Sequence, residues 1–148
     1  LKQKRTLLDQ NHRLQIIKVE VEENSKLDVS DVEFSMPQPS YTIDTLVRLK
    51  EEHPEHDYAL IMGADNLQNL HKWKNFEQIL EDYSIYVYPR HGYEVEGSHK
   101  NIHLIEGVPQ MEISASFIRN SIQQGKDISY LLPDKAWKYT DEMNFYKK

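Results

Sequence analysis

The chain has 148 residues, a formal net charge of −6 at pH 7 and no cysteine. The acidic balance argues against a general nucleic-acid surface, and without cysteine there can be no disulfide, thiolate metal site or cysteine nucleophile. The length suits one domain over residues 1–148. The absence of cysteine fits a reducing cytoplasm, where we expect the protein. No apolar run approaches the roughly 20 residues of a membrane span and no signal peptide is visible, so we expect no membrane partner.

The first part of the chain predicts two helices separated by a strand and a loop. Apolar residues at positions 14, 16, 17 and 21 have nearly helical spacing, which predicts a helix over about residues 10–23. A broken alternation of apolar residues over residues 27–34 predicts a strand, and the two prolines of "SMPQP" predict a loop. The stretch "SYTIDTLVRLKEEH" predicts a second helix, with Ser40 or Thr42 as its cap.

The rest of the chain predicts strands that alternate with helices. The short apolar runs "DYALIMG", "SIYVYPR" and "NIHLIEG" each predict a buried strand of a parallel sheet. Short helices are expected in "ADNLQNLHKW" and "NFEQILEDY", a mobile loop over residues 91–100, and further helices in "EISASFIRNSIQQG" and after Pro133. This alternation is typical of an α/β fold, a doubly wound, Rossmann-like parallel sheet with helices on both faces.

Polar residues follow two of these predicted strands. Gly63 and Asp65 come directly after "ALIM", where the glycine permits close backbone approach and the carboxylate suits ribose hydroxyls, although a turn glycine beside a capping aspartate has the same pattern. Ser114, Ser116 and Arg119 follow "NIHLIEG" at the start of a helix. Two hydroxyls and a guanidinium there predict an anion site, above all for phosphate, while a capping serine with a surface arginine is the structural alternative.

Three further features have both a ligand-binding and a structural interpretation. Free N–H groups at the helix start near Tyr41 and Thr42 suit a carboxylate, but a plain helix cap explains this sequence equally well. Trp73 follows two leucines at spacings of three, which fits a core position as well as a platform for a flat ring. The basic cluster around Lys2 suits a triphosphate, although most such clusters are solvated surface.

The seven histidines raise the question of a metal site. The pairs in "HPEH" and "HKNIH" lie on no clear helix and have no evident third ligand, whereas zinc sites use three or four ligands. We therefore expect no metal site formed by these residues.

Taken together and in this order, several stretches resemble the bacterial nicotinate-nucleotide adenylyltransferase family. "ISASFIR" is shared with many nucleotidyltransferases, whereas "SYTIDTL" followed by G-x-D and a tryptophan eight residues beyond Asp65 points to the nicotinate branch. The resemblance covers nearly the whole chain. The matching stretches are "LKQK", "NHRL", "DVEF", "SYTIDTL", "IMGADNLQNLHKW", "ISASFIR" and "LLPDKAWKY".

This resemblance implies adenylyl transfer between ATP and nicotinate mononucleotide, which gives deamido-NAD and pyrophosphate in NAD biosynthesis. By the same resemblance, Ser114, Ser116 and Arg119 would hold the ATP phosphates, and Gly63 and Asp65 would hold the adenosine side of the ligand. Ser116 and Arg119 are three residues apart, so both reach one side of the helix.

The resemblance also implies the remaining binding and catalytic residues. Tyr41 and Thr42 would receive the nicotinate carboxylate, and Trp73 would stack on the pyridine ring. Lys2 resembles the lysine of a phosphate-contacting loop and would act in catalysis together with Arg119. Mg²⁺ would come with the triphosphate of ATP, and assembly into a homo-oligomer is left open.

The chain departs from the family pattern in three places. Ala115 stands between the two serines where the family has a third hydroxyl, and "MPQP" replaces a loop that often carries Arg and Gly. The family's opening strand and its G-x-F-x-P-x-H-x-G-H motif do not occur in residues 1–148, and the family pattern would place them just before Leu1. We therefore expect residues 1–148 alone to be inactive. Transfer to phosphopantetheine or nicotinamide mononucleotide, and a non-catalytic nucleotide-binding module, remain alternatives.

Overall fold

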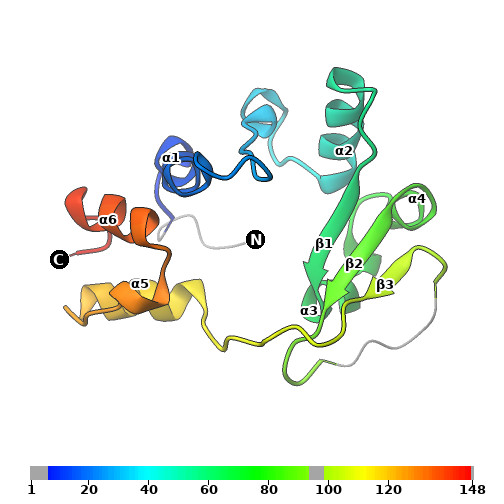
Figure 1. The fold of residues 1–148 in the computed structure, drawn as a ribbon. Helices are drawn as coiled ribbons and strands as arrows, with labels where there is room; N and C mark the ends of the chain where they lie inside the picture. The colour runs from blue at the N-terminus through cyan, green and yellow to red at the C-terminus, as the bar shows by residue number, and fades with distance from the viewer. Residues whose placement is uncertain (1–6, 94–98, 148) are drawn as a thin grey trace. The chain divides into compact units, whose positions relative to one another are not determined.

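The protein forms two compact units in a computed structural model that describes residues 7–93 and 99–147 (Figure 1). The sheet unit comprises Val32–Met111, and the terminal unit combines Leu1–Asp31 with Glu112–Lys148. Division into compact units does not decide whether they fold together, so the single domain stays a prediction. None of the described helices is long and apolar enough to cross a membrane. Lys2 and part of the predicted loop over residues 91–100 lie outside the described residues.

Three parallel strands form the centre of the sheet unit. The strands are β1 (Ala59–Gly63), β2 (Ser84–Tyr88) and β3 (Ile102–Leu104), and their order in the sheet is β1-β2-β3. Both neighbouring pairs are parallel. Parallel neighbours need crossover connections, and helices form the connection between β1 and β2. The three strands and the α/β fold with a parallel sheet predicted from the sequence are confirmed.

Short helices surround this sheet (Figure 1). Each of the helices expected between "SYTIDTL" and the second strand is confirmed, although the first of the two in "ADNLQNLHKW" continues as a 3-10 turn. The elements are the 3-10 helix η2 (Val32–Ser35), α2 (Thr42–Glu52), α3 (Ala64–Gln68), the 3-10 helix η3 (Leu70–Lys72) and α4 (Phe76–Asp82).

One face of the sheet carries the core of this unit. Successive side chains of a strand point to opposite faces, so Met62 is buried while Ile61 is 74% exposed. Tyr86 lies beside Ile61 in the register and is also exposed. The strands were expected to be buried, and the structure shows burial on one face only. The buried core consists of Ile43, Met62, Ala64, Leu70, Ile79, Ile85 and Val87.

The terminal unit is helical and joins the two ends of the described chain. Its helices are α1 (Gln10–Val21), α5 (Ala115–Gln123), the 3-10 helix η4 (Ser129–Leu131) and α6 (Asp134–Glu142). The helix predicted over residues 10–23 is confirmed as α1, and Pro133 stands directly before α6 as expected. The core of the unit is formed by Ile118, Ile122 and Ile128.

The strand predicted over residues 27–34 is wrong. Residues 27–31 are irregular, and the 3-10 helix η2 follows. Leu27 is 55% exposed and Phe34 is 37% exposed, so the apolar side chains do not share a buried face. The Asp28 Oδ1 accepts a hydrogen bond from the backbone N–H of Val29 at 2.7 Å. Such local bonds compete with a strand ladder, and the interrupting polar residues break the period of two.

Candidate functional site

The start of α5 places the predicted anion-binding residues on one side of the helix. Ser114 is the N-cap, and its Oγ accepts the backbone N–H of Phe117 at 3.1 Å. Arg119 donates from Nη2 to Ser116 Oγ at 3.2 Å, which confirms that these two side chains meet one turn apart. The capping interpretation of Ser114 is therefore correct in this structure. Because a hydroxyl that accepts one bond still carries its own donor, capping is compatible with anion binding.

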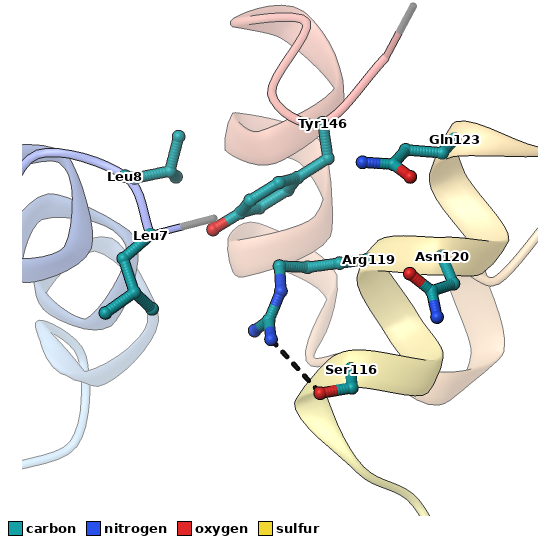
Figure 2. A pocket seen from close by; sticks show the side chains of 7 residues that line it. All are labelled: Leu7, Leu8, Ser116, Arg119, Asn120, Gln123 and Tyr146. Carbon is teal, nitrogen blue, oxygen red and sulfur yellow. Dashed lines mark hydrogen bonds between the residues drawn. The ribbon is translucent and has the colours of Figure 1, made fainter. Parts of the chain in front are cut away.

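A cavity of about 420 Å³ opens beside this turn of α5 (Figure 2). Figure 2 shows the Ser116 hydroxyl joined to the Arg119 guanidinium, with the Tyr146 ring nearby. The free N–H groups of a helix start and a guanidinium together favour an anion. Sequence reasoning missed Tyr146, because its distance along the chain from "ISASFIR" hides the contact. The cavity is lined by Leu7, Leu8, Ser116, Arg119, Asn120, Gln123 and Tyr146.

A second cavity, of about 220 Å³, lies in the sheet unit at the start of α2. It brings together the three residues that were predicted as one substrate site, Tyr41, Thr42 and Trp73. Trp73 also packs against the core of the sheet unit, which confirms its interpretation as a core residue. It lines the cavity as well, and its role as a platform for a flat ring stays a prediction. The full lining is Ser40, Tyr41, Thr42, Lys72, Trp73 and Lys74.

The helix start beside this second cavity is not capped as predicted. Tyr41 is the N-cap in an extended conformation, and its side chain makes no capping bond. Neither Ser40 nor Thr42 is the cap, because the Ser40 hydroxyl donates instead to Glu33 Oε2 at 3.1 Å. Backbone donors in the first turn of α2 therefore have no N-cap side chain as partner, and a ligand carboxylate is a suitable acceptor for them.

Lys72 and Lys74 line one side of this second cavity, and the carboxylate of Asp44 offsets the charge of Lys74. Lys74 Nζ lies 2.8 Å from Asp44 Oδ2 and 4.9 Å from the centre of the Tyr41 ring. Lys72 Nζ donates to Asn69 Oδ1 at 2.7 Å. Both lysines are sequence neighbours of Trp73, so their presence beside the cavity could have been predicted from the sequence. A flat ring that carries a carboxylate matches an indole, two ammonium groups and a helix start.

Gly63 is the last residue of β1, and Asp65 follows it at the start of α3, as predicted. A Cβ on residue 63 would overlap Asp65 Oδ1, so only glycine leaves room for the carboxylate in this position. Asp65 Oδ1 is buried without a hydrogen-bond partner in the described structure, and Arg90 Nε lies 3.5 Å away. A side-chain hydrogen bond with Tyr88 raises the pKa of Arg90, and the charge of Asp65 raises it further. Asp65 thus retains an acceptor for a ligand hydroxyl.

The described residues contain one group with the composition of a metal site. His53 Nδ1 lies 3.7 Å and His56 Nε2 lies 3.5 Å from Glu55 Oε1. All three residues are exposed, and contact between imidazole and carboxylate accounts for their proximity. Glu55 was missed as a third partner for the histidines of "HPEH", because the local sequence did not show that both rings turn toward it. We assign this group no role in the site.

Comparison with known proteins places the chain among nucleotidyltransferases. The cytidylyltransferase-like family model matches residues 1–121. A probable nicotinate-nucleotide adenylyltransferase from Flavobacterium johnsoniae is 55% identical over the whole chain, which covers 78% of that protein. A protein of the same name from Christiangramia forsetii is 49% identical, with 99% of this chain and 77% of the relative covered.

Solved structures agree on the fold. Nicotinic acid mononucleotide adenylyltransferase from Plasmodium falciparum, complexed with NaAD, matches with a TM-score of 0.76. The match covers 98% of this chain and 78% of that chain at 20% sequence identity. A putative nicotinate-nucleotide adenylyltransferase from Vibrio parahaemolyticus matches with a TM-score of 0.72 at 21% identity, covering 97% of this chain and 74% of that chain.

Proposed function

The chain belongs to the nicotinate-nucleotide adenylyltransferase family, and on that premise we propose that it joins nicotinate mononucleotide to the adenylyl group of ATP. The products are deamido-NAD and pyrophosphate, a step of NAD biosynthesis. The observation that carries the proposal is the second cavity, where Trp73, the open start of α2 and Lys74 meet. These groups suit the flat, negatively charged nicotinate ring better than a neutral ligand of the same shape.

Nicotinate mononucleotide would bind in the second cavity through its base. Trp73 would stack on the pyridine ring, and the backbone N–H groups beside Tyr41 and Thr42 would donate to the carboxylate. The ammonium group of Lys74 adds positive charge on the same side. An amide in place of the carboxylate would lose the charge interactions with the lysine and with the helix start.

ATP would bind through two further sets of residues. Ser116 and Arg119 would contact its phosphates, together with the free N–H groups at the start of α5 that Ser114 leaves unpaired. Gly63 and Asp65 would hold the adenosine side, where the unpartnered Asp65 Oδ1 suits a ribose hydroxyl. The proposed contact of Lys2 with the triphosphate concerns a residue outside the described ones. Mg²⁺ would arrive bound to ATP, as part of that substrate.

The reaction itself requires positioning and charge neutralisation. An oxygen of the mononucleotide phosphate attacks the α-phosphorus of ATP, the new P–O bond forms, and the bond to the β-phosphate oxygen breaks as pyrophosphate leaves. The attacking oxygen is already anionic, so no protein residue has to remove a proton from it. Arg119 would offset negative charge on the phosphates as it accumulates.

The test is to measure pyrophosphate release by the full-length protein, as its gene encodes it, with MgATP. Nicotinate mononucleotide, nicotinamide mononucleotide and phosphopantetheine are compared as acceptors. We expect the highest kcat/KM with nicotinate mononucleotide. Higher kcat/KM with either other acceptor would overturn the assigned substrate, and binding of ATP without turnover of any acceptor would favour a binding module. The cytoplasmic location and the homo-oligomer stay predictions.

A further inference from the structure

Glu33 lies in η2, ahead of the loop that leads into α2, and both oxygens of its carboxylate accept hydrogen bonds from hydroxyls. Thr45, in α2, donates from Oγ1 to Oε1 at 2.7 Å. Ser40, ahead of the helix, donates from Oγ to Oε2 at 3.1 Å. One carboxylate therefore holds the chain on both sides of Tyr41 and Thr42, the residues that line the second cavity.

The backbone of Glu33 holds the same loop at two more points. Its carbonyl oxygen accepts the N–H of Met36 at 3.2 Å and the side-chain Nε2 of Gln38 at 3.3 Å. One residue thus makes four hydrogen bonds with residues 36–45, which comprise the loop that carries two prolines and the first residues of α2. The loop and the start of α2 are fixed to η2 as one piece.

This anchoring replaces the missing N-cap. Tyr41 makes no side-chain capping bond, so no residue at the cap position itself fixes the direction in which α2 begins. Glu33 does so from outside the helix, through Thr45 in the first turns and Ser40 before them. Because the carboxylate binds hydroxyls, the backbone N–H groups of the first turn stay available for a ligand.

We infer that Glu33 is a positioning residue for the nicotinate end of the substrate, which it orders through Ser40 and Thr45 without touching the ligand. The inference rests on the proposed function for the identity of that ligand. Loss of the Glu33 carboxylate should let the segment around Tyr41 and Thr42 move, which weakens the contacts to the nicotinate carboxylate. Binding of ATP, which is assigned to other residues, should be unaffected.

The experiment compares full-length Glu33→Ala, Glu33→Gln and the double variant Ser40→Ala/Thr45→Val with Glu77→Gln. Glu77 is the matched control, since it is an exposed glutamate in the first turn of α4 in the same unit. We expect Glu33→Ala to raise KM for nicotinate mononucleotide about five-fold or more, as expected for loss of hydrogen bonds to a charged group. KM for ATP should stay within about two-fold of wild type, because ATP is assigned to residues that Glu33 does not hold.

The other variants separate positioning from general stability. The amide of Glu33→Gln keeps one acceptor oxygen, so its KM should fall between those of wild type and Glu33→Ala. The double variant removes both donors while Glu33 stays, and it should reproduce the effect of Glu33→Ala if the two bonds carry it. Should Glu33→Ala fail to fold, the double variant tests the same bonds.

Amide hydrogen exchange of the ligand-free protein supplies a readout that does not depend on the substrate. Exchange should be faster over residues 40–45 in Glu33→Ala and unchanged there in Glu77→Gln. Wild-type kinetics and exchange in both Glu33→Ala and the double variant would overturn the inference, as would an equal rise of KM for both substrates. Failure of wild type to use nicotinate mononucleotide would refute the proposed function instead, and exchange would still decide the role of Glu33.

Discussion

The sheet unit and the terminal unit bury their cores to different extents. Ile79, Ile85 and Val87 of the sheet unit have no exposed surface. The core residues of the terminal unit all keep some exposure, 8% for Ile118 and 6% for Ile122. In the sheet unit, side chains between the layer of strands and the layer of helices are enclosed from both sides. In the terminal unit, three helices and a 3-10 turn leave part of each core side chain close to solvent.

Polar contacts join sequence-distant segments of the terminal unit. The backbone N–H of Ala136 at the start of α6 donates to Glu20 Oε2 on α1 at 3.0 Å. Lys135 Nζ lies 2.8 Å from Glu23 Oε1 and 3.4 Å from Glu22 Oε1. Exposed ion pairs of this kind contribute little each. The candidate nicotinate cavity is therefore built on the more completely buried core, and the candidate phosphate site on the less completely buried one.

The largest effect is expected from the cores themselves. Ile85→Ala removes a fully buried side chain and should lower the free energy of unfolding by about 2–5 kcal/mol. Ile118→Ala, at a buried site that keeps 8% exposure, should lower it by less, because its side chain is removed less completely from water. Urea unfolding of both full-length variants measures the difference. Equal losses would show that the two cores are equally tight and contradict the comparison.

Arg119→Ala should have the next largest effect, on ATP. A charge-assisted hydrogen bond is worth roughly 1.5–3 kcal/mol, so kcat/KM for ATP should fall by about one to two orders of magnitude. Arg48→Ala is the matched control, since this arginine pairs with Glu52 on the exposed face of α2. Steady-state kinetics with saturating nicotinate mononucleotide measure the change. Unchanged ATP kinetics in Arg119→Ala would refute the phosphate assignment.

Trp73→Ala tests the double role of an indole that packs on the sheet core and lines the cavity. Stacking on an aromatic side chain is worth roughly 1–3 kcal/mol per base, so KM for nicotinate mononucleotide should rise while KM for ATP stays nearly constant. Trp73→Phe keeps an aromatic ring and should restore most of the affinity. If stability alone falls and affinity does not change, Trp73 is only a core residue.

The smallest effect concerns the N-terminus of α1 in the terminal unit. The backbone N–H of Asn11 donates to Asp9 Oδ1 and lowers the pKa of that carboxyl. A lowered native pKa means that the stabilisation is present above the pKa of the unfolded chain and is lost as the pH falls through the native value. Unfolding measured below about pH 4 should therefore show this loss in wild type.

Asp9→Asn is the control for this last prediction. Asparagine can still accept the bond as a cap but does not titrate, so its stability should depend less on pH in this range. Identical pH profiles for wild type and Asp9→Asn would contradict a contribution from this carboxylate.

Elements with a strong local period were predictable from the sequence. The runs that became β1, β2 and β3 are short, apolar and bounded by Gly, Pro or polar residues, and the helix "TIDTLVRLKEE" has a clear apolar face. The interpretation of residues 27–34 as a strand failed because an alternation that breaks once cannot keep one face buried. A strand also needs a partner, and the local sequence does not show whether one is near.

The candidate site was predictable at the level of residue types. Tyr41, Thr42 and Trp73 were expected at one site and do line one cavity, and Ser116 and Arg119 do meet. Their binding roles stay predictions. The partners that shape these sites were not found in advance, because a side chain's chemistry does not tell which distant residue it will contact.

The sequence by itself determined the three strands of the sheet, the α-helices and the family. Only the tertiary structure decided that Lys74 pairs with Asp44, that Arg90 approaches Asp65, and that Glu33 holds both sides of Tyr41. The physical reason is that sequence patterns are local, whereas these contacts join residues that are far apart in the sequence. Periodicity records which face of an element a residue occupies, whereas contacts between elements depend on how those faces pack.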